Sequence, residues 1–323
     1  MAFNVGVVGC GRWGAKHLET LVLLKTQGFI DGVYACDINP NRFDNIPSSI
    51  DGFFPNWMDM HRSVDLDLIS IVTPNSTHST LGMAMLQQGL NVLVEKPLGA
   101  SFDDVKLLCD AAKKSTGSLH SGYLLRFHPG VELAKKLIKE QDIGQVKSIR
   151  FTKYSSRKKP ANANAIENLA SHAFAMIPSL LDSNKSPLFL VAVTLEDLKP
   201  APLATAPQAK FHMVYPSQGA NSQIDVEVQV GWGQEDRNQL TIEGMKQHIR
   251  LDFRLHDSIE YGTHKTGYST IPTPHSMPPL EAQYRHILSN NPSSREITDI
   301  HLQTAKLLDK ATSLAQHWHL HNA

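Results

Sequence analysis

The chain has 323 residues, of which 41% are hydrophobic and 19% charged, and its 31 Lys and Arg residues balance 31 Asp and Glu residues. This apolar content argues against a disordered chain. The zero net charge disfavours binding to nucleic acid or to an anionic membrane, because both draw on a positive field. At about 150 residues per domain, the length predicts two domains.

Short apolar runs alternate with helical stretches in the first 124 residues. The expected strands are apolar throughout rather than alternating, which is typical of strands buried on both faces; they cover 4–8, 32–36, 67–72, 91–94 and 119–123. The pattern predicts helices between them at 12–26, 77–88 and 102–114. Strand–helix–strand repetition implies right-handed crossovers, so residues 1–124 are expected to form a doubly wound parallel sheet.

The pattern changes in residues 125–323. The expected strands here are longer, and some alternate polar with apolar residues as in a sheet with one covered face; they cover 145–154, 189–194, 209–215, 223–232, 238–242 and 248–253. Helices are expected at 131–140, 280–290 and 299–317, the last two after a Pro-rich stretch. These features predict an α+β domain built on a mostly antiparallel sheet.

A glycine-rich segment joins the first expected strand to the first helix. It has the pattern G-x-G-x-x-G and consists of Gly9, Cys10, Gly11, Arg12, Trp13 and Gly14. In such a segment Gly9 makes the tight turn, Gly11 lets the backbone approach a pyrophosphate, and Gly14 lets the helix pack closely on the strand. The helix N-terminus then offers free N–H groups to phosphate oxygens. This spacing predicts a dinucleotide site in a Rossmann domain.

Asp37 ends the second expected strand, 23 residues after Gly14. A carboxylate at this position accepts hydrogen bonds from the ribose hydroxyls of NAD and repels the 2′-phosphate of NADP. Arg42 lies five residues further on and is of the type that meets a 2′-phosphate. We give Asp37 more weight, and expect NAD rather than NADP.

Two polar segments follow further strands of the parallel sheet. Thr73, Pro74 and Asn75, with His78 just beyond, follow one strand; Glu95, Lys96 and Pro97 follow the next along the chain. Open α/β sheets bind their ligands at the carboxyl ends of the strands. An ammonium group at Lys96 suits a substrate hydroxyl, because it stabilises an alkoxide as hydride leaves.

Taken together, these motifs resemble the Gfo/Idh/MocA oxidoreductase family over nearly the whole chain. The carriers of the resemblance are the segments 5–14, 73–78 and 94–97, joined by Gly122-Tyr123, Arg126-Phe127 with Pro129, and 241–244. The resemblance implies a Rossmann domain at 1–124 and a substrate-binding and oligomerisation domain at 125–323 with a large open sheet. It implies hydride transfer between NAD(P) and a hydroxyl of a sugar or polyol, with Lys96 as the active-site lysine.

The resemblance also suggests residues outside the Rossmann domain. The family often carries Asp-x-x-x-His on a helix, with the His as acid/base, and the matching residues here are Asn168 and His172. Spacing i, i+4 puts both on one helix face. At 100° per residue they belong to a narrow polar stripe, which predicts an amphipathic helix that aims His172 at a cavity or at solvent. Tyr123, Arg126 and Arg157 are expected near the substrate.

Asn168 departs from the family pattern, because an amide cannot raise the pKa of His172 by charge. Some nucleotide-sugar dehydrogenases of the family look similar here, and their Arg-x-His-Pro segment resembles residues 126–129. A nucleotide-linked or otherwise anionic sugar is therefore one expected substrate class. Two alternatives remain open: a non-catalytic, NAD-sensing regulator, and a reductase of a non-sugar carbonyl or of a dihydrodiol.

The remaining expectations concern compartment and assembly. The three cysteines, Cys10, Cys36 and Cys109, are odd in number and lack metal-ligand spacing, which predicts a reducing cytoplasm and no metal site. No signal peptide or apolar run of roughly 18 residues is apparent, so no membrane association is expected. The resemblance implies a homo-oligomer, a dimer or tetramer, formed through the second domain's sheet.

Overall fold

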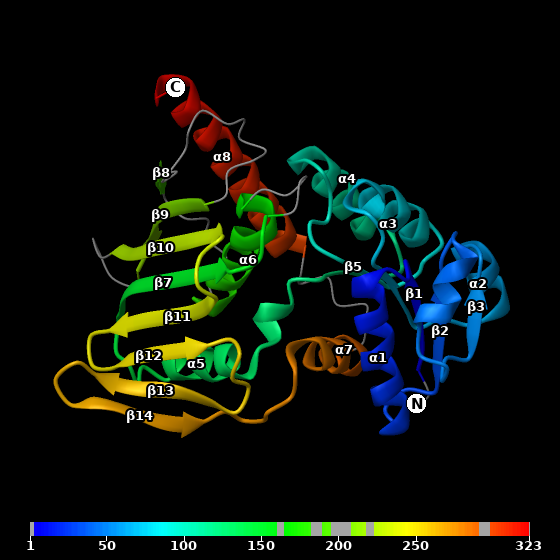
Figure 1. Cartoon of the computed structure of the whole chain (residues 1–323), viewed down its shortest axis with the longest axis horizontal. Coiled ribbons are helices and arrows are strands. Elements are labelled where there is room, and N and C mark those ends of the chain that lie inside the picture. The colour runs from blue at the N-terminus through cyan, green and yellow to red at the C-terminus, as the bar shows by residue number, and fades with distance from the viewer. Residues whose placement is uncertain are drawn as a thin grey trace. The chain divides into compact units, whose positions relative to one another are not determined.

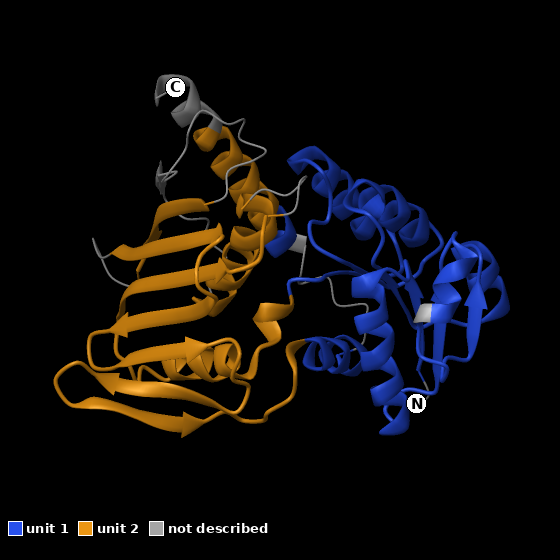
Figure 2. Ribbon diagram, viewed as in Figure 1, with its two compact units in different colours: residues 1–123, 280–302 blue, residues 124–279, 303–323 orange. Residues whose placement is uncertain are grey.

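The computed structural model describes residues 3–159, 165–181, 189–194, 208–217, 223–290 and 298–322. The chain divides into two compact units (Figure 2). The first unit consists of Met1–Tyr123 and Leu280–Leu302, and the second of Leu124–Pro279 and Gln303–Ala323. The predicted division near residue 124 did not foresee that residues 280–302 belong with the first unit.

The first unit is built on a six-stranded, wholly parallel sheet (Figure 1). In spatial order its strands are β3 (Gly52–Phe54), β2 (Gly32–Cys36), β1 (Asn4–Val8), β4 (Leu68–Ile71), β5 (Val92–Val94) and β6 (Leu119–Ser121). The strand order reverses at β1, so a crevice opens between the carboxyl ends of β1 and β4. The predicted Rossmann-type sheet is confirmed. The short β3 was not predicted, because three residues give no periodic signal.

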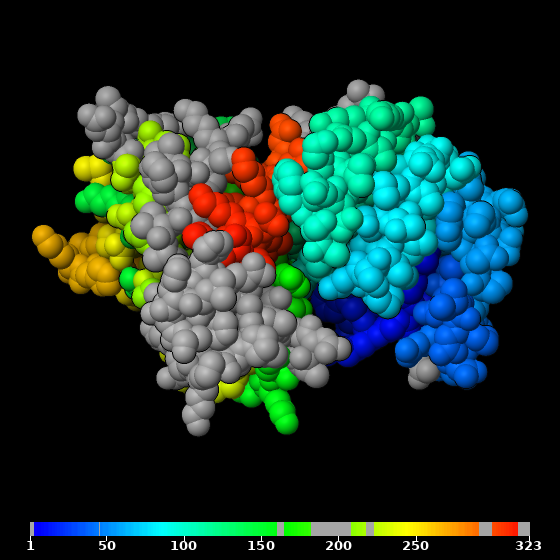
Figure 3. Space-filling view, turned by 90° about the horizontal axis from the view of Figure 1, so that it is seen from above, coloured from blue at the N-terminus to red at the C-terminus, as the bar shows by residue number. Residues whose placement is uncertain are grey.

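Helices connect these strands. They are α1 (Arg12–Thr26), α2 (Trp57–Ser63), α3 (His78–Gln87) and α4 (Phe102–Lys114), with α7 (Pro279–Ser289) added from late in the sequence. Local chemistry sets the start of α4, where the Ser101 hydroxyl accepts a hydrogen bond from the backbone N–H of Asp104 at 3.1 Å. Figure 3 shows α3 and α4 side by side on the surface of this unit.

The second unit is built on an eight-stranded sheet. In spatial order its strands are β14 (Gly267–Pro272), β13 (Ser258–Thr263), β12 (His248–Asp252), β11 (Arg237–Gly244), β7 (Val146–Ser155), β10 (Gln223–Trp232), β9 (Gln208–Pro216) and β8 (Phe189–Thr194). All neighbours are antiparallel except β7 and β10. The predicted α+β fold is confirmed, while the β13–β14 hairpin, part of it in the expected Pro-rich stretch, was not predicted.

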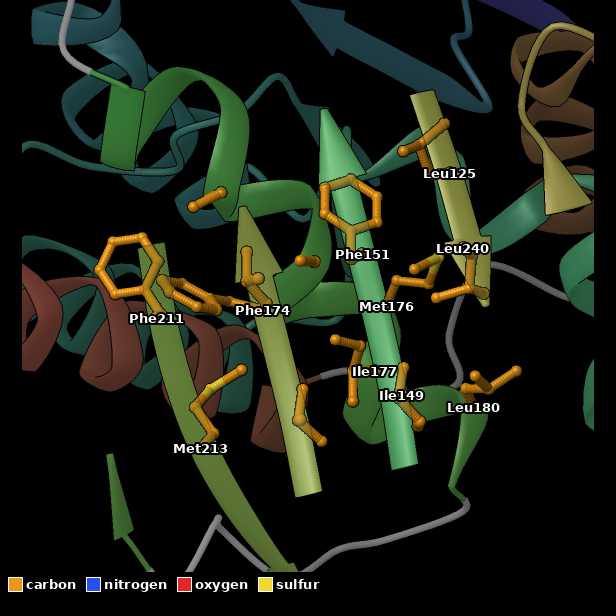
Figure 4. Packing of buried hydrophobic residues seen from close by; sticks show 14 of the residues in the cluster. Leu125, Ile149, Phe151, Phe174, Met176, Ile177, Leu180, Phe211, Met213 and Leu240 are labelled. Carbon is orange, nitrogen blue, oxygen red and sulfur yellow. The ribbon is translucent and has the colours of Figure 1, made fainter. Parts of the chain in front are cut away.

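Helices pack on this sheet and form the core of the second unit. They are α5 (Pro129–Lys139), α6 (Ser171–Leu180) and α8 (Thr298–Asn322), with short turns η3 (Leu124–Phe127) and η4 (Ile166–Ala170). Figure 4 shows Phe174, Met176 and Ile177 of α6 among side chains of the strands. Burying each such side chain contributes about 2–3 kcal/mol. No helix among the described residues is long and apolar enough to span a membrane.

Candidate active site

The first unit contains a cavity of about 840 Å³ at the carboxyl ends of β1, β2 and β4. It is lined by seven of the residues predicted to bind a cofactor: Gly9, Gly11, Arg12, Trp13, Asp37, Thr73 and Pro74. Side chains that the sequence did not single out for this role, such as Ile38, Asn39 and Trp57, complete the lining. The cavity therefore lies at the crevice where this type of sheet binds dinucleotides.

Each glycine of the loop is required for a different structural reason. Gly9 has φ of +98°, and a Cβ there would lie 2.6 Å from the carbonyl oxygen of Val72. A Cβ on Gly14 would lie 1.9 Å from the carbonyl oxygen of Gly9, so a side chain would push α1 off the loop. A Cβ on Gly11 would meet no atom within 4 Å, which leaves the backbone open on that side. These observations fit a loop shaped to receive a pyrophosphate.

Asp37 is held by the loops that surround it. Its Oδ2 accepts the backbone N–H of Cys10 at 2.7 Å, and its Oδ1 accepts the backbone N–H of Asn39 at 2.9 Å. Arg42 also lines the cavity, so a carboxylate and a guanidinium face the same space. These residues therefore fit an adenosine ribose. Asp37 favours NAD, and Arg42 is of the residue type that binds the 2′-phosphate of NADP.

Cys10 lies within the glycine loop but is itself buried and does not line the cavity. Burial, with the nearby charge of Asp37, raises the pKa of its thiol to about 12. A thiol with this pKa stays protonated at neutral pH, so it is a poor nucleophile. Cys10 contributes its backbone N–H to the site, through Asp37.

His78 was predicted to contact the cofactor, but it is not among the residues that line the cavity. The ring is buried, with Nδ1 at 2.7 Å from the carbonyl oxygen of Pro97 and Nε2 at 2.9 Å from that of Thr73. It therefore ties the segment after β4 to the segment after β5. Gly14, Asn75, Glu95 and Lys96 are likewise absent from the described cavity lining.

Lys96 is half-buried and is the second residue after β5, and the backbone is bonded on both sides of it. Its own N–H donates to Oε2 of Glu95 at 3.1 Å, and the next carbonyl, that of Pro97, contacts His78. Burial alone would raise the pKa of Glu95, but hydrogen bonds from His17 and Trp13 and the charges of His17 and Lys96 hold this pKa below its ordinary value. Glu95 is thus an anion at neutral pH.

Three buried residues near Glu95 were not predicted as site residues: His17, Ser70 and Tyr284. His17 approaches Glu95 Oε1 through Nε2 at 3.2 Å and the hydroxyl of Tyr284 through Nδ1 at 2.7 Å. The Tyr284 hydroxyl also lies 2.7 Å from Oγ of Ser70. In the sequence, only the position of His17 on the first helix after the glycine loop could have indicated a role in the site. Its partner Tyr284 is 267 residues away, so their contact could not be predicted from local sequence.

Asn168 and His172 lie in the second unit, where the predicted amphipathic helix is corrected in two ways. Ile166–Ala170 is a π-helical turn, and α6 follows it. The expected polar stripe does not face solvent, since Ser171 and His172 are buried and α6 is buried on nearly all sides. The burial excludes solvent, which was one of the two surroundings predicted for the stripe, and the predicted cavity stays an expectation. His172 keeps an exposed fraction of 7%, and Asn168 is half-buried.

The proposed substrate residues have different environments. Tyr123 is buried at the end of the first unit, and Arg126 is half-buried in η3 with its guanidinium 5.8 Å from the ring centre of Phe127. Arg157 is exposed after β7. In the Arg-x-His-Pro segment, His128 is buried and caps α5, accepting the backbone N–H of Gly130 at 3.1 Å.

Burial and the neighbouring His256 lower the pKa of His128 to about 4, against a weaker opposing hydrogen bond with the backbone of Phe253. The ring packs edge-on against Phe253, with 5.2 Å between ring centres. His128 is therefore neutral at pH 7, and its described contacts are those of a helix cap within the core.

Among curated proteins, the chain is 26% identical over 242 residues to inositol 2-dehydrogenase 1 of Saccharopolyspora erythraea, covering 71% of this chain and 67% of that protein. It is 25% identical over 188 residues to levoglucosan dehydrogenase of Pseudarthrobacter phenanthrenivorans. That alignment covers 54% of this chain and 47% of the relative, so the chain spans about half of that protein's length.

Solved structures match over nearly the whole chain. Levoglucosan dehydrogenase in complex with NADH has a TM-score of 0.77 at 18% identity, covering 99% of this chain and 98% of that one. UDP-N-acetylglucosamine 3-dehydrogenase of Acidithiobacillus ferrooxidans has a TM-score of 0.77 at 18% identity, covering 98% of this chain and 100% of that one. At these identities the matches show a shared two-part fold.

The model of the oxidoreductase family with NAD-binding Rossmann fold matches residues 3–123, which contain the glycine loop, Asp37 and Lys96. The match, the curated relatives and the shared fold agree with the resemblance found in the sequence motifs. Residues 3–123 therefore form the NAD-binding Rossmann domain of the Gfo/Idh/MocA oxidoreductase family, and the whole chain shares the two-part fold of solved oxidoreductases.

Proposed function

We propose that this protein is an NAD-dependent dehydrogenase that transfers a hydride between the nicotinamide and a secondary hydroxyl of a sugar, polyol or nucleotide sugar. One observation carries the proposal: a single unit holds a glycine-lined cavity, a bonded Asp37 and a lysine at a nearby strand end. Similarity to inositol and levoglucosan dehydrogenases supports the sugar or polyol class.

Each residue has a role in this proposal. The glycine loop and the α1 N-terminus bind the pyrophosphate, since Gly11 caps α1 without a side-chain hydrogen bond and leaves N–H groups available. Asp37 binds the adenosine ribose and favours NAD. Bound NAD supplies the hydride acceptor. Lys96 stabilises the negative charge that develops on the substrate oxygen, His172 accepts the hydroxyl proton, and Asn168 orients its ring.

The proposal also covers the substrate class, the oligomeric state and the cellular location, which family membership alone does not determine. A nucleotide-linked sugar is one expected substrate, supported by Asn168 and by the fold shared with a UDP-N-acetylglucosamine dehydrogenase. A homo-oligomer would use the face of the eight-stranded sheet that carries Arg150, Glu227 and Lys210, where Glu227 pairs with both cations. Cytoplasmic location is supported by three cysteines that are buried thiols.

A non-catalytic, NAD-sensing regulator is the second candidate. The observation in its favour is the site around His172, which lacks the usual carboxylate at Asn168 and is almost closed to solvent. Lys96 argues against it, because sensing NAD requires no ammonium group at a strand end.

The two functions are separated by incubating the purified protein with NAD and a panel of polyols, anhydrosugars and nucleotide sugars. If the protein is a dehydrogenase, NADH absorbance should appear with one class of substrate and should be lost in Lys96→Ala. NAD binding by titration, with no NADH formed from any member and no NADH consumed with the matching ketones, would contradict the enzyme and favour the regulator.

A further inference from the structure

We propose that Glu95 is a positioning residue for Lys96, and that a buried chain of His17, Tyr284 and Ser70 holds Glu95 in place. This inference rests on the proposed role of Lys96 in the reaction. All of its members belong to the first unit, although α7 brings Tyr284 from the far end of the sequence.

The first step concerns the carboxylate itself. Glu95 has an exposed fraction of 6%, and a buried carboxylate is costly unless its oxygens accept hydrogen bonds. Oε1 faces Nε2 of His17 at 3.2 Å and Oε2 accepts the backbone N–H of Lys96 at 3.1 Å, while Trp13 donates through its indole, which has one N–H. The carboxylate is therefore fixed at both oxygens, and one contact fixes the backbone at Lys96.

The second step concerns the contacts behind His17. A carboxylate only accepts, so Nε2 of His17 carries a proton. Nδ1 of the same ring lies 2.7 Å from the Tyr284 hydroxyl, and that hydroxyl lies 2.7 Å from Oγ of Ser70, so the contacts continue from the carboxylate to Ser70. Burial is the main cause that raises the pKa of Tyr284, so its O–H remains available to donate. The side chains of His17, Tyr284 and Ser70 thus each have a polar partner in this buried series.

The third step concerns room for the carboxylate. A Cβ on Gly122, which follows β6, would lie 2.6 Å from Oε1 of Glu95. On α7, Gln283 donates to the carbonyl oxygen of Ser121 at 2.7 Å, one residue before this glycine. The space beside Glu95 is therefore held open by the same helix that supplies Tyr284.

These contacts connect the cofactor cavity to Lys96. Trp13 lines the cavity, donates to Glu95 and packs edge-on against the ring of His17, with 5.9 Å between ring centres. Glu95 places a negative charge next to Lys96 and accepts a hydrogen bond from the backbone N–H of Lys96. The arrangement sets both the position and the charge environment of Lys96, and it couples them to the helix that begins at the glycine loop.

Two variants test this positioning in the full-length protein. Glu95→Gln keeps the size of the side chain and removes its charge. The new NH₂ group also takes the place of an oxygen that accepts an N–H, so two donors then face each other. Tyr284→Phe removes one hydroxyl from a residue that does not line the cavity. The matched control is Tyr215→Phe in the second unit, where the tyrosine is equally buried and its hydroxyl has no hydrogen-bond partner among the described residues.

The first readout does not depend on turnover: the pH midpoint for acylation of the Lys96 amine by acetic anhydride, followed by mass spectrometry of the peptide. Loss of the neighbouring charge in Glu95→Gln should lower this midpoint by about half a pH unit or more, since an opposite charge favours the ammonium form. The second readout is kcat against the affinity for NAD. Tyr284→Phe should lower kcat by about tenfold with NAD affinity within about twofold, while Tyr215→Phe changes neither.

An unchanged midpoint in Glu95→Gln, or equal effects of Tyr284→Phe and Tyr215→Phe on kcat, would overturn the proposal. Failure of the proposed function has a different signature. If Lys96→Ala keeps wild-type turnover, Lys96 is not the active-site group, whereas the acylation midpoint still reports whether Glu95 sets its environment. A circular dichroism melt of each variant identifies any that does not fold, and the remaining variant then decides.

Discussion

The backbone N–H of Cys10 donates to Oδ2 of Asp37 at 2.7 Å, so the residue expected to select the cofactor also holds the glycine loop. A substitution that removes the side chain therefore changes both the charge and the loop. Separating these effects requires a substitution that keeps an acceptor in place. Asn at position 37 does this, because its amide oxygen accepts one N–H.

We predict that wild-type protein binds NAD more tightly than NADP, and that Asp37→Asn narrows this preference. The neutral amide no longer repels a 2′-phosphate, and Arg42 in the same cavity can then bind it. Fluorescence titration with both cofactors measures the ratio, with Asp37→Ser as the variant that also disturbs the loop. The double variant Asp37→Asn/Arg42→Ala should lose the increase in NADP affinity that Asp37→Asn gains. Tighter binding of NADP by wild type would contradict the assignment.

Much of the first unit could be predicted from sequence because its signals are local. The glycine spacing, the residue after the second strand and the Ser101 cap each depend on a few neighbouring residues, and the structure places Gly9, Gly11 and Asp37 around one cavity. The contribution of α7 was not predictable in this way. Its Tyr284 meets His17 across 267 residues, and no local pattern reports so distant a contact.

The second unit shows a different limit. Strict alternation predicted β10, whose buried and exposed residues alternate along most of the strand. The pattern on α6 predicted a polar stripe that faces a cavity or solvent, and burial excludes solvent; small residues such as Ala175 and Ser171 pack in a core as readily as they face water. The π-turn at Ile166–Ala170 also shifts the helical register that the 100° rule assumes.

We predict that Lys96→Ala folds and binds NAD but loses about a hundredfold in kcat. Removing a preorganised charge from the reacting oxygen costs on the order of 3 kcal/mol. Steady-state kinetics with the substrate identified by the panel, together with an NAD titration, checks both halves. Lys106→Ala is the matched control, since Lys106 lies on the surface of α4 and pairs with Asp110. Turnover near the wild-type rate in Lys96→Ala would show that another group stabilises the substrate oxygen.

We predict that His172 is the proton acceptor and that Asn168→Asp raises the apparent pKa on the acidic limb of kcat/KM. A carboxylate within about 4 to 6 Å of the ring favours its charged form, whereas the amide adds no net charge. The pH dependence of kcat/KM is measured for wild type, Asn168→Asp and His172→Ala. An unshifted profile in Asn168→Asp, with His172 still essential, would place Asn168 away from the ring. Wild-type rates in His172→Ala would remove the histidine from the mechanism.

The last prediction concerns stability and the buried cap of α5. The pKa of His128 is lowered to about 4 from 6.5, chiefly by burial and secondly by His256. Between these two values the unfolded chain binds a proton that the folded chain does not, so stability falls as pH decreases through this window. The difference of about 2.5 pH units corresponds to a loss on the order of 3 kcal/mol.

His128→Asn should remove this dependence while it keeps a side chain suited to cap the helix. At pH 7 the variant is expected to be less stable than wild type by about 1–3 kcal/mol, because the ring contact with Phe253 is lost. As pH falls from 6.5 to 4, the two stabilities should converge, since only wild type then loses the contribution of the buried neutral ring. Urea unfolding at several pH values in this range measures the difference, with His212→Asn at a half-buried strand position as the control that retains the wild-type slope. Parallel curves for His128→Asn and wild type would show that His128 is protonated in the folded protein, and that the cap does not depend on a neutral ring.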